Sequence, residues 1–366
     1  MDTLTLPLLL IGVVLLVFGA DFLVRGASAI AERLGISPIV IGLTVVAFGT
    51  SAPELAVSVN ASLSGNNDVA FGNVVGSNIF NILFILGISA AIGGLAITQR
   101  IVRLDVPILI GISILTYVLA LNNSIGRLEG AVFFAGLVAY TTWLIRASRK
   151  ESAAIAAEYK KGVEEIEGDV KFSPMMWQLG LIVVGLAMLI VGSNFLVGSA
   201  SDLARSLGVS DLVIGLTVVA AGTSLPELAT SVLAAIRGER DIAVGNVVGS
   251  NIFNLLGVLG LSAVVSNGGV RVSDVSLTLD IPVMIAATVV LIPIFWNGFR
   301  IKRWEGVLLA VFYVVYVVYL VLVNIEHDSS TMVGFASTFV AILVALGFSV
   351  AGYQGWRQHR AAQRLN

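Results

Sequence analysis

The chain has 366 residues, of which 57% are hydrophobic and only 12% are Asp, Glu, Lys or Arg, and its net charge is −2. Soluble domains carry about 25% charged residues, so this composition excludes a soluble enzyme, a secreted disulfide scaffold and a nucleic-acid-binding protein. Cysteine is absent, which excludes disulfide and thiolate chemistry. The hydrophobic residues come in runs of about 20, the length that crosses a bilayer as a helix, and they predict an all-α membrane protein.

Hydrophobic runs between polar breaks predict eleven membrane-spanning helices in chain order. In the first half of the chain these are 5–24, 38–63, 69–95, 104–122 and 129–146. A charged segment at 147–175 follows and is predicted to be a cytoplasmic connector. The later helices are 176–198, 211–236, 242–266, 278–297 and 304–324, then an extra helix at 332–353 and a basic cytoplasmic tail at 354–366.

Lys and Arg are distributed unevenly between the two sides that this arrangement creates. If the N-terminus is outside, only Arg127, Arg205 and Arg271 of the 21 Lys and Arg residues face outward. Positive residues accumulate on the cytoplasmic side of membrane proteins. We therefore predict an integral protein of the cell (inner) membrane, with its N-terminus outside and its C-terminus in the cytoplasm.

The sequence also repeats itself. Residues 37–87 align without a gap to residues 210–260, with 35 of 51 positions identical. Each copy contains five predicted helices, and an odd number forces the second copy to cross the membrane in the opposite sense. The pattern therefore predicts two inverted five-helix repeats, 1–146 and 176–324, with ten transmembrane helices and an eleventh C-terminal helix outside the repeat.

The most similar stretch is also the most polar one inside the predicted membrane. It reads GLTVVAFGTSAPELAVS at Gly42–Ser58 and GLTVVAAGTSLPELATS at Gly215–Ser231, with Glu54 and Glu227 near the middle of their predicted helices. A carboxylate at that depth is costly unless it is paired, protonated or bound to a cation. Neither helix, 38–63 or 211–236, contains Lys or Arg, which points to a dissolved cation or a proton as the partner.

The neighbouring residues favour a site made of oxygen atoms. Pro53 lacks an N–H and frees the carbonyl of Gly49, and Pro226 does the same for Gly222, so each helix is expected to open at the following threonine. Carboxylates, carbonyls and hydroxyls together suit hard cations such as calcium and sodium. The hydroxyls recur at equivalent positions in the two copies: Thr50, Ser51 and Ser58, and Thr223, Ser224 and Ser231.

The next helix of each copy carries a second polar stripe, GNVVGSNIFN, at Gly72–Asn81 and Gly245–Asn254. Side chains spaced by four residues share a helix face. These are Asn73, Ser77 and Asn81 in the first copy, and Asn246, Ser250 and Asn254 in the second. The asparagines, with Asn78 and Asn251 beside them, either bind an ion or only bridge neighbouring helices, and the serines either bind an ion or bond within their own helix.

The paired G-T-S-x-P-E-L and G-N-V-V-G-S-N-I-F-N segments resemble the alpha repeats of the calcium/cation antiporter superfamily, specifically the prokaryotic sodium/calcium exchangers. The resemblance covers roughly residues 5–324. The calcium ligands that it implies are Glu54, Glu227, Thr50 and Thr223. The sodium ligands that it adds are Ser51, Ser224, Ser77, Ser250, Asn81, Asn254 and the carbonyls of Ala47 and Ala220.

Two features depart from the family pattern. Some relatives carry Asp at one of the paired positions where this chain has the neutral Asn81 and Asn254, so its site has only two formal negative charges. The eleventh helix also exceeds the ten of the family core.

The expected function is secondary active antiport of Ca²⁺ against Na⁺ by alternating access, without enzymatic activity and without a cofactor beyond the transported ions. Exchange of three sodium ions for one calcium, which the resemblance implies, would be electrogenic. Two alternatives stay open: a Ca²⁺ exchanger coupled to H⁺ or K⁺ through the same glutamates, and a cation channel. The expected surroundings are a lipid bilayer, with no nucleic-acid partner.

Overall fold

A computed structural model describes residues 5–160, 172–206, 220–296 and 298–326, together with residues 338, 339 and 342. The helices of the first half are α1 (Thr5–Leu34), α2 (Pro38–Ile41), η1 (Gly42–Val46), α3 (Ala47–Thr50), α4 (Ala52–Leu63), α5 (Asn67–Ile79), η2 (Phe80–Ile85), α6 (Leu86–Gly93), η3 (Ile101–Asp105), α7 (Val106–Ala120) and α8 (Arg127–Lys160). Those of the second half are α9 (Phe172–Ser206), α11 (Ala220–Gly222), α12 (Leu225–Arg237), α13 (Arg240–Phe253), η5 (Asn254–Val258), α14 (Leu259–Val265), η6 (Ser276–Asp280), α15 (Ile281–Trp296) and α16 (Arg303–Glu326), where η marks a π-helical turn. The four short strands are β1 (Leu95–Ala96), β2 (Ser124–Ile125), β3 (Val270–Arg271) and β4 (Arg300–Ile301).

Several helical stretches of the described chain are long and apolar enough to cross a membrane. Eight continuous stretches, some of which combine α-helices with a π-helical turn, meet that description, and the bent pair Pro38–Thr50 and Ala52–Leu63 makes a ninth candidate. The prediction of a helical integral membrane protein is thereby confirmed. Of the predicted span 211–236 the structure describes the part from residue 220, and the predicted helix 332–353 lies outside the described residues except at three positions.

Three helices extend beyond their predicted spans, so those predicted boundaries are wrong. α1 continues past residue 24 to Leu34, and α8 continues past residue 146 to Lys160. α9 runs from Phe172 to Ser206. Hydrophobic runs mark only the part of a helix that fits the bilayer, whereas Ala, Glu and Arg favour helix in any surroundings. Part of the predicted connector at 147–175 is therefore helical, and the predicted tail, 354–366, lies outside the described residues.

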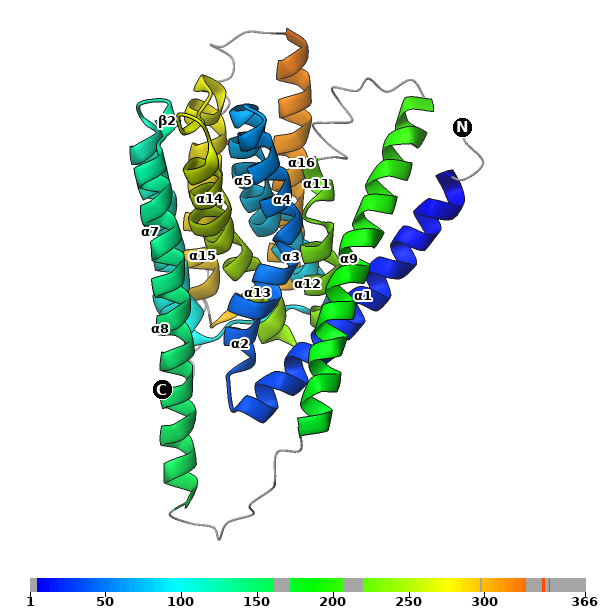
Figure 1. Cartoon of the computed structure of the whole chain (residues 1–366), viewed down its shortest axis with the longest axis vertical. Coiled ribbons are helices and arrows are strands. Elements are labelled where there is room, and N and C mark those ends of the chain that lie inside the picture. The colour runs from blue at the N-terminus through cyan, green and yellow to red at the C-terminus, as the bar shows by residue number, and fades with distance from the viewer. Residues whose placement is uncertain are drawn as a thin grey trace, which may run out of the picture.

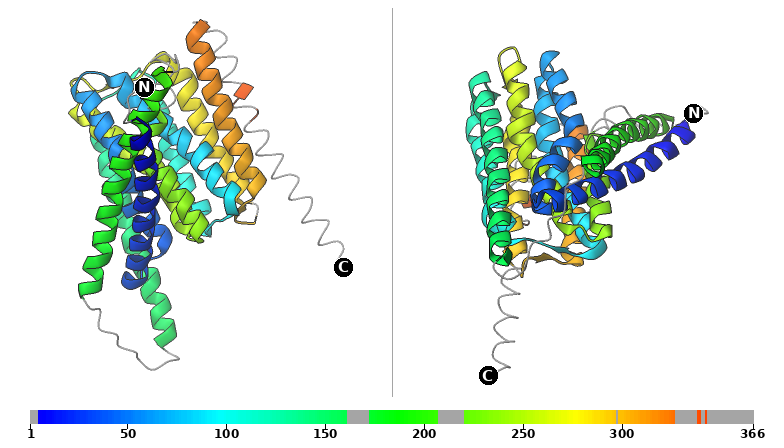
Figure 2. Two further views of the ribbon diagram at one scale, coloured as in Figure 1. Left: turned by 90° about the vertical axis from the view of Figure 1, so that its right-hand side faces the viewer. Right: turned by 60° about the horizontal axis from the view of Figure 1, so that its bottom comes forward.

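The helices α1 and α9 form a pair that stands apart from the main bundle (Figure 1), and a second view shows the pair projecting from it (Figure 2). The two backbones meet at glycines. A Cβ atom added at Gly19 would lie 2.8 Å from the carbonyl oxygen of Gly185, and one added at Gly185 would lie 2.7 Å from that of Gly19. These distances leave no room for a side chain, so the backbones touch directly, as in other small-residue contacts between membrane helices.

An acidic residue on α1 also connects this pair to the bundle. Asp21 is 8% exposed, and its carboxylate lies 3.0 Å from Nε of Arg25 and pairs with Arg237 at the end of α12. The equivalent positions of the repeat, 173 residues later and earlier, hold Asn194 and Ser64. Those side chains carry no charge, so the ion pair belongs to one copy alone.

Two spans form the centre of the bundle. In the most hydrophobic stretch of α5–η2–α6, 72% of residues are buried, and in that of α13–η5–α14, 89%. The corresponding figure for α8 is 17%, which puts α8 at the periphery. The polar stripes predicted on the two central spans are therefore kept away from lipid, where unpaired polar groups would be costly.

Short antiparallel strands join the two halves of the chain at both ends of the bundle. β1 pairs with β4, so that Leu95 faces Ile301, and β2 pairs with β3, so that Ile125 faces Val270. β2 lies at the upper end of the bundle in Figure 1. Each pair thus ties a loop of the first half to a loop of the second.

The glycine contact between α1 and α9 generates a stability prediction. Gly185→Val should lower the thermal unfolding midpoint of the detergent-purified protein by several degrees, because overpacking costs about 1–3 kcal/mol. Gly180→Val on the same helix is the control, since a Cβ there would meet nothing within 4 Å. Equal midpoints for the two variants would contradict the direct backbone contact.

Candidate cation-binding site

The first motif helix breaks one residue after its threonine. α3 ends at Thr50, α4 begins at Ala52, and the two helices are bent by 47°. Ser51 lies at the break with φ −82° and ψ 8°. Pro53 has no N–H to donate to the carbonyl of Gly49, so the helix opens there, and the predicted opening is confirmed.

The second motif helix breaks at the equivalent place. α11 ends at Gly222 and α12 begins at Leu225, with Ser224 at φ −91° and ψ 10°. The carbonyl oxygen of Gly222, which Pro226 leaves without its helical donor, accepts a hydrogen bond from Oγ of Ser193 on α9 at 2.6 Å. The motifs gave no sign of Ser193, because the equivalent residue of the first copy is Ala20.

Both glutamates lie at the start of a half-helix, directly after the predicted opening, and not near the middle of a helix. Glu54 is in the first turn of α4, Glu227 is in the first turn of α12, and neither side chain is exposed. The positive end of a helix dipole stabilises a carboxylate at this position. Within the described residues, no Lys or Arg forms an ion pair with either glutamate.

Each glutamate is held by a serine from the other half of the chain. Oγ of Ser224 donates to Oε1 of Glu54 at 2.7 Å, and Oγ of Ser51 donates to Oε1 of Glu227 at 2.8 Å. Each serine directly precedes the half-helix that carries the other glutamate. These reciprocal bonds bring the two carboxylates into one site, and Oγ of Ser77 on α5 joins them at 3.1 Å from Oγ of Ser224.

The threonines of the motifs bond to asparagines of the second stripe. Oγ1 of Thr50 donates to Oδ1 of Asn246 at 3.1 Å, and Oγ1 of Thr223 donates to Oδ1 of Asn73 at 3.3 Å. Both bonds again cross between the two halves. The side-chain amides of these asparagines donate to the serines that close the motifs, Asn73 to Ser58 and Asn246 to Ser231, both at 2.9 Å.

A second set of asparagines bridges the two central spans. Nδ2 of Asn81 donates to Oδ1 of Asn251 at 3.0 Å, and Nδ2 of Asn254 donates to Oδ1 of Asn78 at 3.1 Å. Nδ2 of Asn78 also donates to the carbonyl oxygen of Asn251 at 3.3 Å. Asn78 and Asn251 therefore bridge helices, which was one of the two functions considered for them.

Five buried side-chain oxygens in the predicted site receive no hydrogen bond from the described residues. A buried acceptor without a donor costs about 1–3 kcal/mol, so each of these atoms is free to accept a bond from a ligand. The described residues hold no cluster of three or more His, Cys, Asp or Glu, which leaves a site of two carboxylates and neutral oxygens. The five atoms are Oε2 of Glu54, Oε2 of Glu227, Oδ1 of Asn81, Oδ1 of Asn254 and Oγ of Ser250.

Two of the remaining predicted ligands are the backbone carbonyls of Ala47 and Ala220. Ala47 is fully buried, and its carbonyl accepts a hydrogen bond from Oγ1 of Thr50 at 3.4 Å. Ala220 begins α11, where the structure describes its backbone. The hydrogen bonds of the described chain join Glu54, Ser224 and Ser77 in one group and Glu227 and Ser51 in another. Thr50 and Thr223 bond to Asn246 and Asn73, whereas Asn81 and Asn254 bond to Asn251 and Asn78, and no hydrogen bond of the described residues connects that pair to the glutamates.

Comparison with known proteins identifies the family of this site. The sequence pattern of the sodium/calcium exchanger protein family matches residues 4–146 and 177–322. The chain is a member of the sodium/calcium exchanger family. This exchanger is 36% identical over 354 residues to the sodium/calcium exchanger MaX1 of Methanosarcina acetivorans, covering 87% of this chain and 99% of that one.

Two further proteins resemble this chain over most of its length. The inner membrane protein YrbG of Escherichia coli is 34% identical over 291 residues, which cover 79% of this exchanger and 88% of YrbG. The solved structure of the sodium-calcium exchanger NCX_Mj superposes with a TM-score of 0.74 at 30% identity, covering 87% of this exchanger and 99% of that chain.

The asparagine bridge predicts a loss of stability. Asn251→Ala removes the acceptor of the Asn81 amide, which leaves a buried donor unpaired and should destabilise the protein by about 2 kcal/mol. The measurement is the thermal unfolding midpoint of the purified exchanger. Asn60→Ala, at an exposed position of α4, is the control and should change the midpoint little. A midpoint for Asn251→Ala equal to that of the control would contradict the bridge.

Proposed function

We propose that this exchanger moves Ca²⁺ out against an inward flow of Na⁺ through a single site built around Glu54 and Glu227. The observation that carries the proposal is that the two oxygens of each carboxylate differ in their hydrogen bonding. Oε1 is held by a serine of the other repeat, whereas Oε2 is buried without a donor among the described residues. Two such oxygens facing one site provide the negative charge that a divalent cation needs after it loses its water.

The ligands follow from the same arrangement. Ca²⁺ neutralises the two carboxylates and is completed by oxygens of Thr50 and Thr223 at the broken turns. Na⁺ uses the same glutamates with neutral oxygens around them, so the two ions compete for one site. These neutral ligands are Ser51, Ser224, Ser77, Ser250, Asn81, Asn254 and the carbonyls of Ala47 and Ala220. A set composed of oxygens alone favours hard cations over zinc or copper.

The architecture that we propose is two inverted repeats of five helices each, with the N-terminus outside. The strand pairing supports it. By the repeat alignment, β1 corresponds to β3 and β2 to β4, yet β1 pairs with β4 and β2 with β3. Equivalent loops thus lie at opposite ends of the bundle, which is what inversion in the membrane produces. Such symmetry allows one site to face either side in turn.

Charge balance leads to an electrogenic cycle. One Ca²⁺ carries two charges, and the exchange of three Na⁺ for it would move one net positive charge per turnover. Because Asn81 and Asn254 are neutral, the two glutamates are the only formal charges among the proposed ligands. The direction of net exchange then depends on the ion gradients and on the membrane potential.

The glutamates provide the first test of this function. Glu54→Gln and Glu227→Gln keep the size of the side chain but each removes one negative charge, so each should abolish calcium-45 uptake into sodium-loaded proteoliposomes. Glu32→Gln, at an exposed position of α1, is the matched control and should transport normally. Near-normal exchange by both site variants at normal expression would falsify the shared site.

The coupling ion is identified by imposing sodium, potassium and proton gradients in turn on the wild-type vesicles. We expect uptake to follow the sodium gradient. Uptake that follows the potassium or proton gradient would show that this ion, and not sodium, is the coupling ion. Uptake that requires no counter-ion on the opposite side would indicate a channel.

The charge balance predicts a response to voltage. Calcium uptake driven by a fixed sodium gradient should change its rate when valinomycin and potassium set the membrane potential, because a net charge moves in each cycle. The change in uptake rate should have the opposite sign when the membrane potential is reversed. A rate indifferent to the potential would indicate two Na⁺, or two H⁺, per Ca²⁺.

A further inference from the structure

A basic cavity lies beside the strand pair β1–β4, away from the glutamates. Its volume is about 310 Å³, and it is lined by the end of α6, the start of α13 and the segment from β4 into α16. Four of its lining residues are cationic: Arg240, Arg300, Lys302 and Arg303. None of the described residues that line it is acidic.

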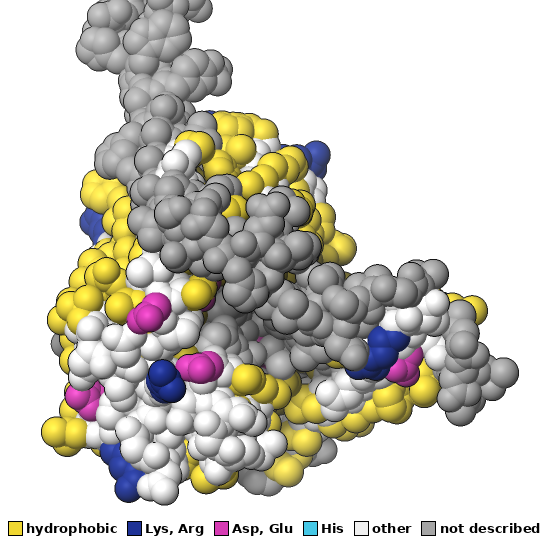
Figure 3. Space-filling view, turned by 90° about the horizontal axis from the view of Figure 1, so that it is seen from above, with side chains coloured by type: hydrophobic (Ala, Val, Ile, Leu, Met, Phe, Trp, Pro, Cys, Tyr) yellow, Lys and Arg dark blue, Asp and Glu magenta, His cyan; other side chains and the backbone are white. Residues whose placement is uncertain are grey.

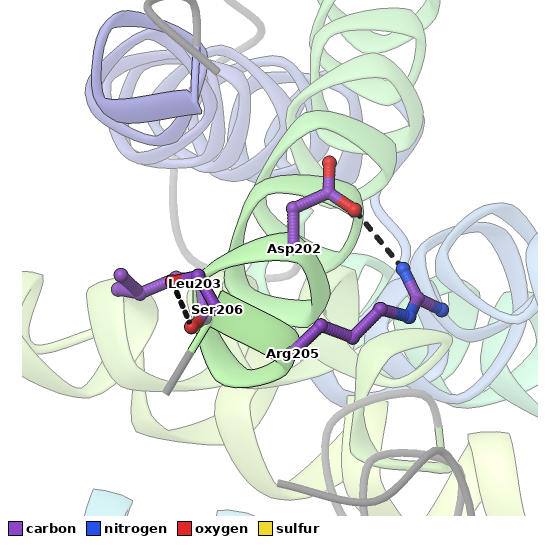
Figure 4. Close-up of polar contacts among 4 residues, drawn as sticks. All are labelled: Asp202, Leu203, Arg205 and Ser206. Carbon is purple, nitrogen blue, oxygen red and sulfur yellow. Dashed lines mark hydrogen bonds and ion pairs between the residues drawn. The ribbon is translucent and has the colours of Figure 1, made fainter. Parts of the chain in front are cut away.

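The four cations have no anionic partner within the described part of the chain. Some basic residues elsewhere do have acidic partners: Arg25 and Arg237 pair with Asp21, and Arg205 pairs with Asp202 at 3.0 Å (Figure 4). At the upper end of the bundle, seen from above in Figure 3, acidic and basic side chains are interspersed. The basic cavity therefore concentrates positive charge that the protein leaves unbalanced.

The acidic residues close in sequence do not line the cavity. Glu305 is 1% exposed and accepts a hydrogen bond from the backbone N–H of Lys302 at 2.8 Å. Glu239 lines a different cavity, beside α1, and Asp241 lies on α13. Two helix N-termini, those of α13 and α16, add the positive ends of their dipoles to the cationic side.

We propose that this cavity binds the headgroup of an anionic phospholipid from the leaflet on its side of the membrane. Charge complementarity selects a phosphate-bearing anion. Two exposed tryptophans near the cavity favour a lipid over a soluble anion. Trp304, next to Arg303 in α16, is 49% exposed, and Trp296 at the end of α15 is 68% exposed. Exposed Trp is typical of the headgroup level of a bilayer.

The acyl chains have a hydrophobic stripe to follow. Side chains at positions i, i+4, i+7 and i+11 share a helix face, and such a row begins one turn after Arg303. Each member of the row is about half exposed, so the stripe faces the surrounding lipid. Its members are Val307, Val311, Val314 and Val318. A phospholipid seated here would place its phosphate among the cations and its chains along α16, which a soluble anion could not do.

The cavity also lies on the side that is expected to face anionic lipid. Its basic residues belong to the loops that the distribution of Lys and Arg assigns to the cytoplasm. Cytoplasmic leaflets are rich in anionic lipid, and each Lys or Arg near their surface strengthens attachment about five-fold. The inference does not depend on which cations the exchanger transports.

The test measures lipid binding directly. The full-length exchanger is stripped of lipid in a neutral detergent, equilibrated with phosphatidylglycerol or phosphatidylcholine of identical acyl chains, and analysed by native mass spectrometry. The wild type should retain phosphatidylglycerol in preference. The double variant Arg300→Gln/Arg303→Gln should bind phosphatidylglycerol about 30-fold more weakly, since it lacks two of the cations.

The matched control removes the same charge on the same predicted side but outside the cavity. Arg103→Gln/Arg146→Gln, at two exposed positions, should keep the preference for phosphatidylglycerol. Equal binding of the two lipids by the wild type, or equal losses in the two double variants, would overturn the proposal. The single variant Lys302→Gln should bind phosphatidylglycerol about five-fold more weakly. It replaces the cavity double variant in the test if that variant does not remain monodisperse.

A separate arm distinguishes a lipid from a free anion. Inorganic phosphate at millimolar concentration is added to the complex with phosphatidylglycerol. The lipid should remain bound, because the valine stripe holds its chains. Displacement by phosphate alone would show that the cavity takes a soluble anion and would overturn the assignment to lipid.

Discussion

Two carboxylates buried in the centre of a membrane protein without a basic partner constrain the rest of this structure. Neither Glu54 nor Glu227 can be left bare in a medium of low dielectric constant, and the described chain offers no Lys or Arg to pair with them. In this fold, helix N-termini and hydroxyl donors stabilise the two carboxylates. Breaking each helix one residue after its threonine turns the glutamate into a first-turn residue, where the helix dipole stabilises its charge. What the protein leaves unsatisfied, one oxygen on each carboxylate, is what a cation can complete.

The same constraint explains why the surrounding side chains are neutral amides and hydroxyls. A third acidic residue would add repulsion, and a basic one would compete with the transported ion. Asn and Ser supply oxygens without charge, and their hydrogen bonds join the two halves of the chain at the site. Thr50 to Asn246 and Thr223 to Asn73 are examples in which one half of the chain positions the ligands of the other. Neither half could form the site alone.

Much of this could be predicted from the sequence, because some of its causes are local. The missing N–H of Pro53 and Pro226 fixes where each helix opens, and the doubled motif marks the glutamates and the polar stripe. The partners of these residues could not be predicted, because spacing along one helix does not identify the helix opposite. The Ser224–Glu54 bond joins residues 170 positions apart. Ser193 could not be identified from the repeat, because the first copy has Ala20 at that position. The ends of α1, α8 and α9 could not be predicted, because hydropathy marks only the part of a helix that lies in lipid, and helical hydrogen bonding continues beyond it.

The similarity between the two copies of the repeat makes their differences informative. Asp21 of α1 pairs with Arg25 and with Arg237 of α12, whereas the equivalent residues of the repeat are Asn194 on α9 and Ser64 directly after α4. Separating α1 from α12 would break the ion pair between Asp21 and Arg237, whereas Asn194 and Ser64 carry no charge and can form no such pair. The ion pair is thus a contact that one half of the chain makes and the other cannot copy. Because it lies outside the proposed ion site, a substitution at Asp21 or Arg237 would remove it without changing any of the proposed ion ligands.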